Sequence, residues 1–173
     1  QIFKSVKSEI KNGSKNNLKV INIKVEERPT GEVSAGAGVG TDGGSFAINV
    51  SENNWLGEGK KVNFEFEISQ DSVKGQLNYN NPNYDLLGNS LNYKLTNVTN
   101  DKPDQGYENK LISAGASTSF EQFKNIFTSI GLDLSYDDLR TTNNASASLK
   151  KQAGDFVELS GNYGFTFDQR DRS

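Results

Sequence analysis

Hydrophobic and polar residues alternate with a period of two over most of this chain, which is the pattern of β-strands that have one apolar face. The clearest run is that of Val62, Phe64, Phe66 and Ile68, which are separated by the polar residues Asn63, Glu65 and Glu67. Runs of the same kind recur from Val33 to Phe167, with turn-forming residues between them. The pattern predicts about eight antiparallel strands after Gly31 and an all-β fold.

Two shorter segments, Ile2–Ile10 and Leu18–Glu27, precede these strands and are joined by a polar segment with an Asn12-Gly13 step. An Asn-Gly step between two such segments predicts a β-hairpin. Because an isolated hairpin is marginal in water, we expect it to belong to a small α+β domain with further elements upstream. The residues that follow, from Arg28 to Gly31, include Pro29 and indicate a boundary.

The turns between the expected strands differ in length. Gln70-Asp71-Ser72 is tight, whereas the polar segments Asn97–Glu108 and Asp137–Asp155 are long. In outer-membrane barrels, short turns gather at one end and long loops at the other. The lengths therefore predict that the two long segments share the end that faces away from the cell.

Alternation alone fits a soluble β-sandwich as well as a membrane barrel, because both have one apolar face. The chain is only 33% hydrophobic and its mean hydropathy is -0.68, which is little for a dry core. Aromatic residues are expected near strand ends, where membrane barrels place interfacial rings; these are Trp55, Tyr79, Tyr84 and Tyr136. No apolar stretch approaches the roughly 20 residues of a membrane-spanning helix. These features favour a transmembrane β-barrel over a sandwich or solenoid.

The composition excludes several classes of protein. The formal net charge is -3 and no basic run appears, which argues against binding to nucleic acid. Cys and His are absent, which removes thiolate nucleophiles, sulfur-ligated metals and the usual general base. Glu65 and Glu67 have the spacing of one polar strand face, and Asp137-Asp138 is expected at a solvated tip. We therefore expect no catalytic residues, no metal site, no cofactor and no enzyme activity.

Several short strings carry a family resemblance. They are the residues from Val25 to Gly31 and from Ser34 to Gly40, Asn53–Lys60 with Trp55-Leu56-Gly57 at its centre, and Asn81-Pro82-Asn83-Tyr84, followed much later by Phe167-Asp168-Gln169-Arg170-Asp171. In order and spacing they resemble the BamA family of outer-membrane assembly factors. This family is part of the POTRA-plus-barrel insertase superfamily, of the bacterial surface antigen type.

The resemblance implies a division of the chain into three parts. Residues 1–27 would be the C-terminal hairpin of a periplasmic POTRA domain, 28–31 (Arg28, Pro29 and Thr30 with Gly31) a linker, and 32–173 the N-terminal half of a barrel. The expected strands would then be about eight of an implied sixteen-stranded antiparallel up-and-down barrel. The chain would lie in the outer membrane of a Gram-negative bacterium, with its N-terminal part in the periplasm. Its implied partners are nascent outer-membrane proteins, periplasmic chaperones, assembly lipoproteins and the lipid bilayer, without nucleic acid.

The family's function implies a role for the first barrel strand, from Gly31 to Gly40. It would form one side of a lateral seam that pairs with strands of incoming barrel proteins. The residues implied are Gly31, Val33, Ala35, Gly36, Ala37, Gly38, Val39 and Gly40. Glycine weakens a strand, which suits a seam that exchanges partners, although strand glycines also mark crowded or bent barrel walls. The alternative functions are a related secretion or autotransporter-assembly pore, a passive outer-membrane channel, and a soluble β-sandwich binding module.

Overall fold

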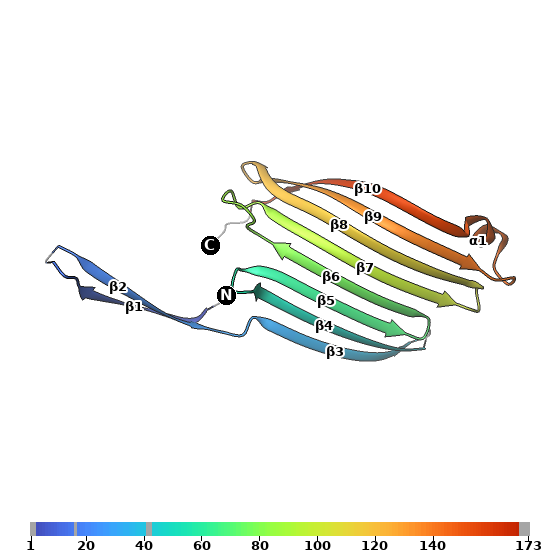
Figure 1. The fold of residues 1–173 in the computed structure, drawn as a ribbon, viewed down its shortest axis with the longest axis horizontal. Helices are drawn as coiled ribbons and strands as arrows, with labels where there is room; N and C mark the ends of the chain where they lie inside the picture. The colour runs from blue at the N-terminus through green and yellow to red at the C-terminus, as the bar shows by residue number, and fades with distance from the viewer. Residues whose placement is uncertain (1–2, 16, 41–42, 170–173) are drawn as a thin grey trace. The chain divides into compact units, whose positions relative to one another are not determined.

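The computed structural model describes residues 3–15, 17–40 and 43–169. The chain divides into two compact units, Gln1–Gly31 and Glu32–Ser173. The first is a two-stranded sheet and the second is an eight-stranded sheet with one short helix (Figure 1). Ile2, at the start of the predicted hairpin, and Arg170-Asp171, at the end of the last short string, lie outside the described residues.

The first unit is the predicted β-hairpin. Strands β1 (Phe3–Asn12) and β2 (Lys19–Glu27) pair in antiparallel register, with Ile10 opposite Ile21 and Val6 opposite Val25. The Gly13 amide closes the turn by donating to the Leu18 carbonyl at 2.9 Å. The hairpin prediction is confirmed over its described residues.

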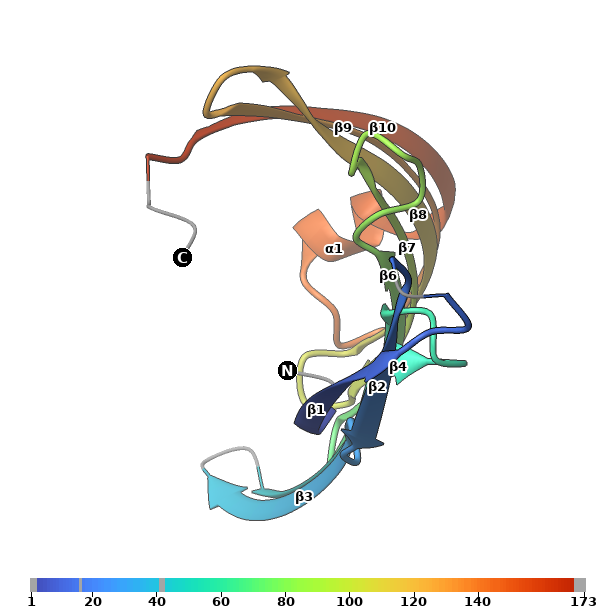
Figure 2. The same cartoon turned by 90° about the vertical axis from the view of Figure 1, so that its left-hand side faces the viewer.

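The second unit is an antiparallel meander in which every strand pairs with its neighbours in sequence. Its strands are β3 (Gly31–Gly40), β4 (Gly43–Trp55), β5 (Lys60–Ser69), β6 (Ser72–Asn81), β7 (Ser90–Lys102), β8 (Tyr107–Phe123), β9 (Ile126–Thr141) and β10 (Gly154–Phe167). The sheet is strongly curved and open, with β3 and β10 at its two edges (Figure 2). The predicted all-β, up-and-down barrel class is confirmed.

The strand register sorts the side chains onto two faces. One continuous row on what we term the apolar face runs through Val50, Phe64, Leu77, Leu95, Ala114, Leu134 and Leu159. The adjacent row on the polar face runs through Asn49, Glu65, Gln76, Thr96, Ser113, Ser135 and Glu158. The alternation in the sequence therefore gives a sheet with one apolar and one polar face.

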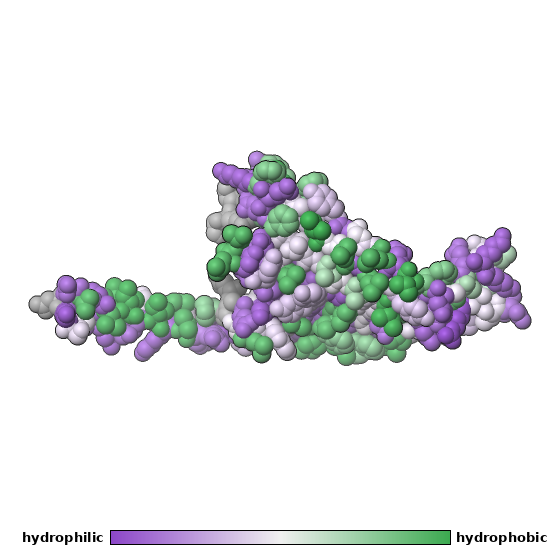
Figure 3. Space-filling view, turned by 45° about the horizontal axis from the view of Figure 1, so that its top comes forward, coloured by the Kyte–Doolittle hydropathy of each residue, from purple (hydrophilic) through white to green (hydrophobic). Residues whose placement is uncertain are grey.

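The apolar face is the exposed one. Leu132 and Leu134 are 59% and 51% exposed, whereas their neighbours Asp133 and Ser135 are half-buried, as expected for a convex apolar face. Figure 3 shows hydrophobic residues over the body of the sheet and hydrophilic residues at the end that carries the helix. Among the described residues, Ala145 is the only buried hydrophobic one. The sheet thus has no dry core, and the β-sandwich interpretation is wrong.

The two segments expected to be long share one end of the sheet, as predicted, but the tight turn lies at that same end, so the predicted separation of short and long turns is wrong. Because the strands alternate in direction, residues 70–71, 103–106 and 142–153 lie at one end of the sheet, here called the helix end. Residues 56–59, 82–89 and 124–125 lie at the Gly31 end, where β3 begins. The tight turn at Asp71 also contacts a segment that was expected at the other end of the sheet, because the Lys102 ammonium lies 3.0 Å from the Asp71 carboxylate. Most of Asn97–Glu108 extends β7 and β8 instead, whereas most of Asp137–Asp155 remains a connection, residues 142–153, between β9 and β10.

A short helix, α1 (Ala147–Gln152), lies in the connection between β9 and β10 and was not predicted. Its N-cap is Ser146, whose hydroxyl accepts a hydrogen bond from the Leu149 amide at 3.2 Å. In the part of the chain that the structure describes, no helix is long and apolar enough to cross a membrane.

Candidate functional site

The strand expected to form the seam is an edge of the eight-stranded sheet. β3 pairs with β4 on one side only, and all ten of its residues are exposed. Val33 and Val39 are 72% and 92% exposed. The backbone N–H and C=O groups on the free side of such a strand can pair with another strand. β3 therefore has the geometry that strand addition requires.

Crowding does not account for the glycines of β3. A Cβ added to Gly36 or Gly40 would meet no atom within 4 Å. A Cβ added to Gly38 would lie 3.5 Å from the Ser45 hydroxyl, which is an ordinary contact. The close approach that makes glycine necessary in some strands is therefore missing here, and glycine without such a need lowers the stability of a strand.

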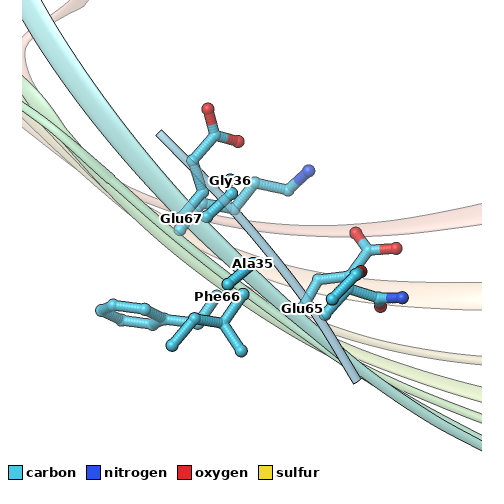
Figure 4. Close-up of a pocket in the computed structure, with 10 residues that line it drawn as sticks. Ala35, Gly36, Glu65, Phe66 and Glu67 are labelled. Carbon is cyan, nitrogen blue, oxygen red and sulfur yellow. The ribbon is translucent and has the colours of Figure 1, made fainter. Parts of the chain in front are cut away.

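A pocket of about 370 Å³ lies where β3 meets the next three strands. On one side of it Ala35 lies beside Phe66, and on the other side Glu65 and Glu67 extend away from them (Figure 4). Lys74 of β6 stands opposite Glu67 in the register. On the β3 side, Ser34 lines the pocket and Gly36 adds no side chain to it.

The apolar face is shorter near β3 than at the other edge of the sheet. On β4 it extends from Phe46 to Val50 and is followed by Glu52 on the same face. On β10 it extends from Val157 to Phe167. A membrane-spanning strand needs about 9–11 residues, so the apolar face is full-length at β10 and short at β4.

The four predicted interfacial aromatics lie in different parts of the sheet. Trp55 ends β4 and Tyr84 lies in the turn after β6, both at the Gly31 end and 44% and 47% exposed. Tyr79 packs against Tyr93 of β7 with ring centroids 6.0 Å apart. Tyr136 lies in the half of β9 nearer the helix end and is 41% exposed. Tyr93 was missed, although its place opposite Tyr79 follows from the alternation once the register is known.

The linker residues Arg28, Pro29 and Thr30 lie between β2 and β3 and belong to neither strand. Arg28 and Pro29 are exposed, while Thr30 is half-buried. Gly31, which the sequence assigned to both linker and strand, is the first residue of β3.

Polar side chains pair with one another across the polar face. The Asn63 amide donates to Asn49 at 2.7 Å, Ser72 donates to Asn100 at 2.8 Å, and Asn162 donates to Asp133 at 2.9 Å. Within residues 3–15, 17–40 and 43–169, no three acidic side chains come together as they would to hold a metal ion. The polar face is a surface of uncharged hydrogen-bonding groups with scattered charges, as in a water-filled lumen.

The expectation that Asp137-Asp138 forms a solvated tip is wrong. Both residues lie within β9, where successive side chains point to opposite faces. Asp137 accepts a hydrogen bond from Asn109, and Asp138 is 7% exposed and ion-paired with Arg140 at 2.8 Å. The sequence could not place them because β9 continues beyond the last clearly alternating residue, Tyr136.

A curved antiparallel meander with an exposed apolar face, a polar lumen face and no dry core is the wall of a membrane β-barrel. A family model, the Omp85 superfamily domain, matches residues 54–173. This chain belongs to the Omp85 superfamily, and the superfamily expected from the short strings is confirmed.

A solved structure shares the fold over almost the whole chain. It is the crystal structure of BamA from Haemophilus ducreyi lacking POTRA domains 1–3, which superposes with a TM-score of 0.71 and is 22% identical in sequence. The match covers 99% of this chain and 36% of that one. The chain thus spans about a third of the length of the protein that it matches.

Proposed function

We propose that this chain is part of an outer-membrane protein assembly factor, located in the outer membrane of a Gram-negative bacterium. Membership in the Omp85 superfamily and the fold shared with BamA support this assignment. In this proposal, residues 1–27 are the last hairpin of a periplasmic POTRA domain, 28–31 are the linker, and 32–173 are the first half of the barrel. The Gly31 end of the sheet then faces the periplasm.

In the proposed mechanism, β3 is one side of a lateral seam that pairs with a strand of an incoming barrel protein. The observations that carry the proposal are that β3 is the first strand of the curved sheet and that a Cβ added at Gly36, Gly38 or Gly40 would meet no crowding. In lipid, each unsatisfied backbone group costs several kcal/mol, so a free edge recruits a partner strand. No bond is made or broken, and no cofactor is needed.

Two further features support β3 as the exchanging strand. Its three uncrowded glycines reduce the stability of any pairing that it makes, so a partner can be released. The apolar face is also short at β4, so the bilayer would be least well matched beside β3. Nascent outer-membrane proteins, chaperones and assembly lipoproteins are the partners that this function requires.

Site-specific photocrosslinking tests the seam directly. A photoreactive residue at Val33 should give adducts with outer-membrane proteins during their assembly. Val157 on β10 is the matched control, because it is the same residue type, is also 72% exposed and lies on the opposite edge strand. Equal adducts at the two sites, or none at Val33, would contradict the proposed seam.

The same experiment separates the alternatives. A secretion or autotransporter-assembly pore would give adducts with its exported substrate at polar-face positions such as Ser113 rather than at Val33. A passive channel would give no protein adducts at either place.

A further inference from the structure

A groove runs along the apolar face over β8. Its floor is formed by Ala114 and Ala116, and its walls are formed by larger side chains of the neighbouring strands, namely Tyr93, Leu95, Leu132, Leu134 and Leu159. The hollow over this floor measures about 470 Å³. A second hollow of about 350 Å³, walled by Phe64, Leu77 and Ile112, shares Leu95 and Ala114 with the first. The two hollows adjoin at Leu95 and Ala114, and together they are called the groove here.

The groove is open on the face that an outer-membrane barrel turns toward lipid. Its walls Leu95, Leu132 and Leu134 are 52%, 59% and 51% exposed, and they are continuous with the rest of the apolar face. An apolar hollow that stays empty loses dispersion contacts along its lining. In a bilayer, the molecule available to fill it is a lipid acyl chain.

A polar end of the groove indicates where the headgroup lies. Tyr93 walls the groove toward the Gly31 end, and its ring is 6.0 Å from that of Tyr79. Just beyond Tyr79, Lys60 begins β5 and is ion-paired with Glu58. Tyrosine hydroxyls and an ammonium group are hydrogen-bond donors of the kind that bind phosphate oxygens at a membrane interface.

We propose that this groove binds one glycerophospholipid, with an acyl chain over Ala114 and Ala116 and its phosphate beside Tyr93, Tyr79 and Lys60. The leaflet rests on the proposed function, which places the Gly31 end on the periplasmic side. The bound lipid would therefore be a phospholipid of the inner leaflet. It would fix the depth of the β7–β9 wall in the bilayer.

Retention of lipid by the purified protein tests this site. The full-length protein is reconstituted in vesicles of phosphatidylethanolamine and phosphatidylglycerol and then extracted into detergent. Its mass, with any bound lipid, is measured by native mass spectrometry. We expect one retained phospholipid per protein, and at least a tenfold loss of the lipid-bound species in Ala116→Leu, which fills the floor. Ser135→Leu adds a leucine to the polar face of the next strand and should retain the lipid.

A second variant tests the site without the risk that Ala116→Leu loses lipid only because it misfolds. Tyr93→Phe keeps the groove and removes one hydroxyl, so it should lower retention severalfold without changing the seam adducts at Val33. The site is overturned if the parent protein retains no phospholipid, if Ala116→Leu retains as much as the parent, or if Ser135→Leu loses as much as Ala116→Leu. Failure of the seam would appear in the Val33 adducts alone, with lipid retention intact.

Discussion

At the scale of single residues, the glycines of the sheet form two groups with opposite roles. Gly36 in β3 has open space where a Cβ would lie. Gly131 in β9 is covered, because a Cβ there would lie 2.6 Å from the Asn162 side-chain oxygen and 2.9 Å from the Ser117 Cβ. The first glycine lowers the stability of an edge strand. The second leaves room for the side chains of Asn162 and Ser117 on the polar face.

The two groups predict opposite effects of alanine. Gly36→Ala should stabilise β3 by about 0.5–1 kcal/mol, which slows its amide hydrogen exchange roughly two- to fivefold. Gly131→Ala should destabilise the sheet by about 1–3 kcal/mol through overpacking. Hydrogen exchange of β3 and urea unfolding in lipid vesicles measure the two effects. A destabilising Gly36→Ala would show that β3 is crowded after all.

At the scale of elements, the turn between β6 and β7 is organised by one carboxylate. The Asp85 Oδ1 accepts hydrogen bonds from the amides of Leu87 and Asn89, each at 3.0 Å, and Oδ2 accepts one from the Asn89 side chain at 2.6 Å. These bonds, led by that from the Asn89 backbone, hold the pKa of Asp85 below its ordinary value of 3.8. Leu86 and Leu87, which lie in this turn, are 105% and 86% exposed.

The lowered pKa sets the pH dependence of this turn. Because the carboxylate form is favoured in the folded state, its stabilising contribution is complete above pH 3.8 and is lost as the pH falls through the lower folded-state pKa. Exchange of the Leu87 and Asn89 amides, corrected for the intrinsic rate, should therefore stay slow down to that pH and then accelerate. The step should disappear in Asp85→Asn. A step well above pH 3.8, or one that persists in the variant, would contradict this role.

The strands could be predicted from the sequence, but the end of the sheet at which each turn lies could not. Alternation along Val62–Ile68 fixes which side chains share a face, because the period of a strand is two. The length of a segment such as Asn97–Glu108 does not show at which end of the sheet it lies. Its end depends on the number of strands that precede it. The helix α1 was missed for a related reason, since six residues inside a polar segment give little periodic signal.

The residues of the candidate site could be predicted from the sequence, but the contacts that they make could not. The glycine run of β3 and its place as first barrel strand follow from the sequence and the family resemblance. The absence of crowding around the β3 glycines depends on side chains of β4, such as Ser45, and these can be placed only once the strand register is known. The pairing of Asp138 with Arg140 and the groove over Ala114 likewise join residues whose neighbours are set by the sheet.

At the scale of the whole molecule, the second unit is a curved sheet whose apolar side chains are exposed and whose polar side chains are crowded. This is the reverse of a water-soluble domain, which buries its apolar face. Every part of the proposal, including the seam at β3 and the lipid groove over β8, depends on the apolar face meeting lipid and the polar face meeting water.

Cysteine accessibility tests that dependence most directly, because the chain has no cysteine of its own. Leu134 and Ser135 are adjacent in β9 and point to opposite faces, and each can be replaced by cysteine in the full-length protein. In lipid vesicles, a water-soluble maleimide should label Ser135→Cys readily and leave Leu134→Cys unlabelled until the protein is unfolded in urea. Labelling of Leu134→Cys as fast as Ser135→Cys in intact vesicles would contradict a lipid-facing apolar surface.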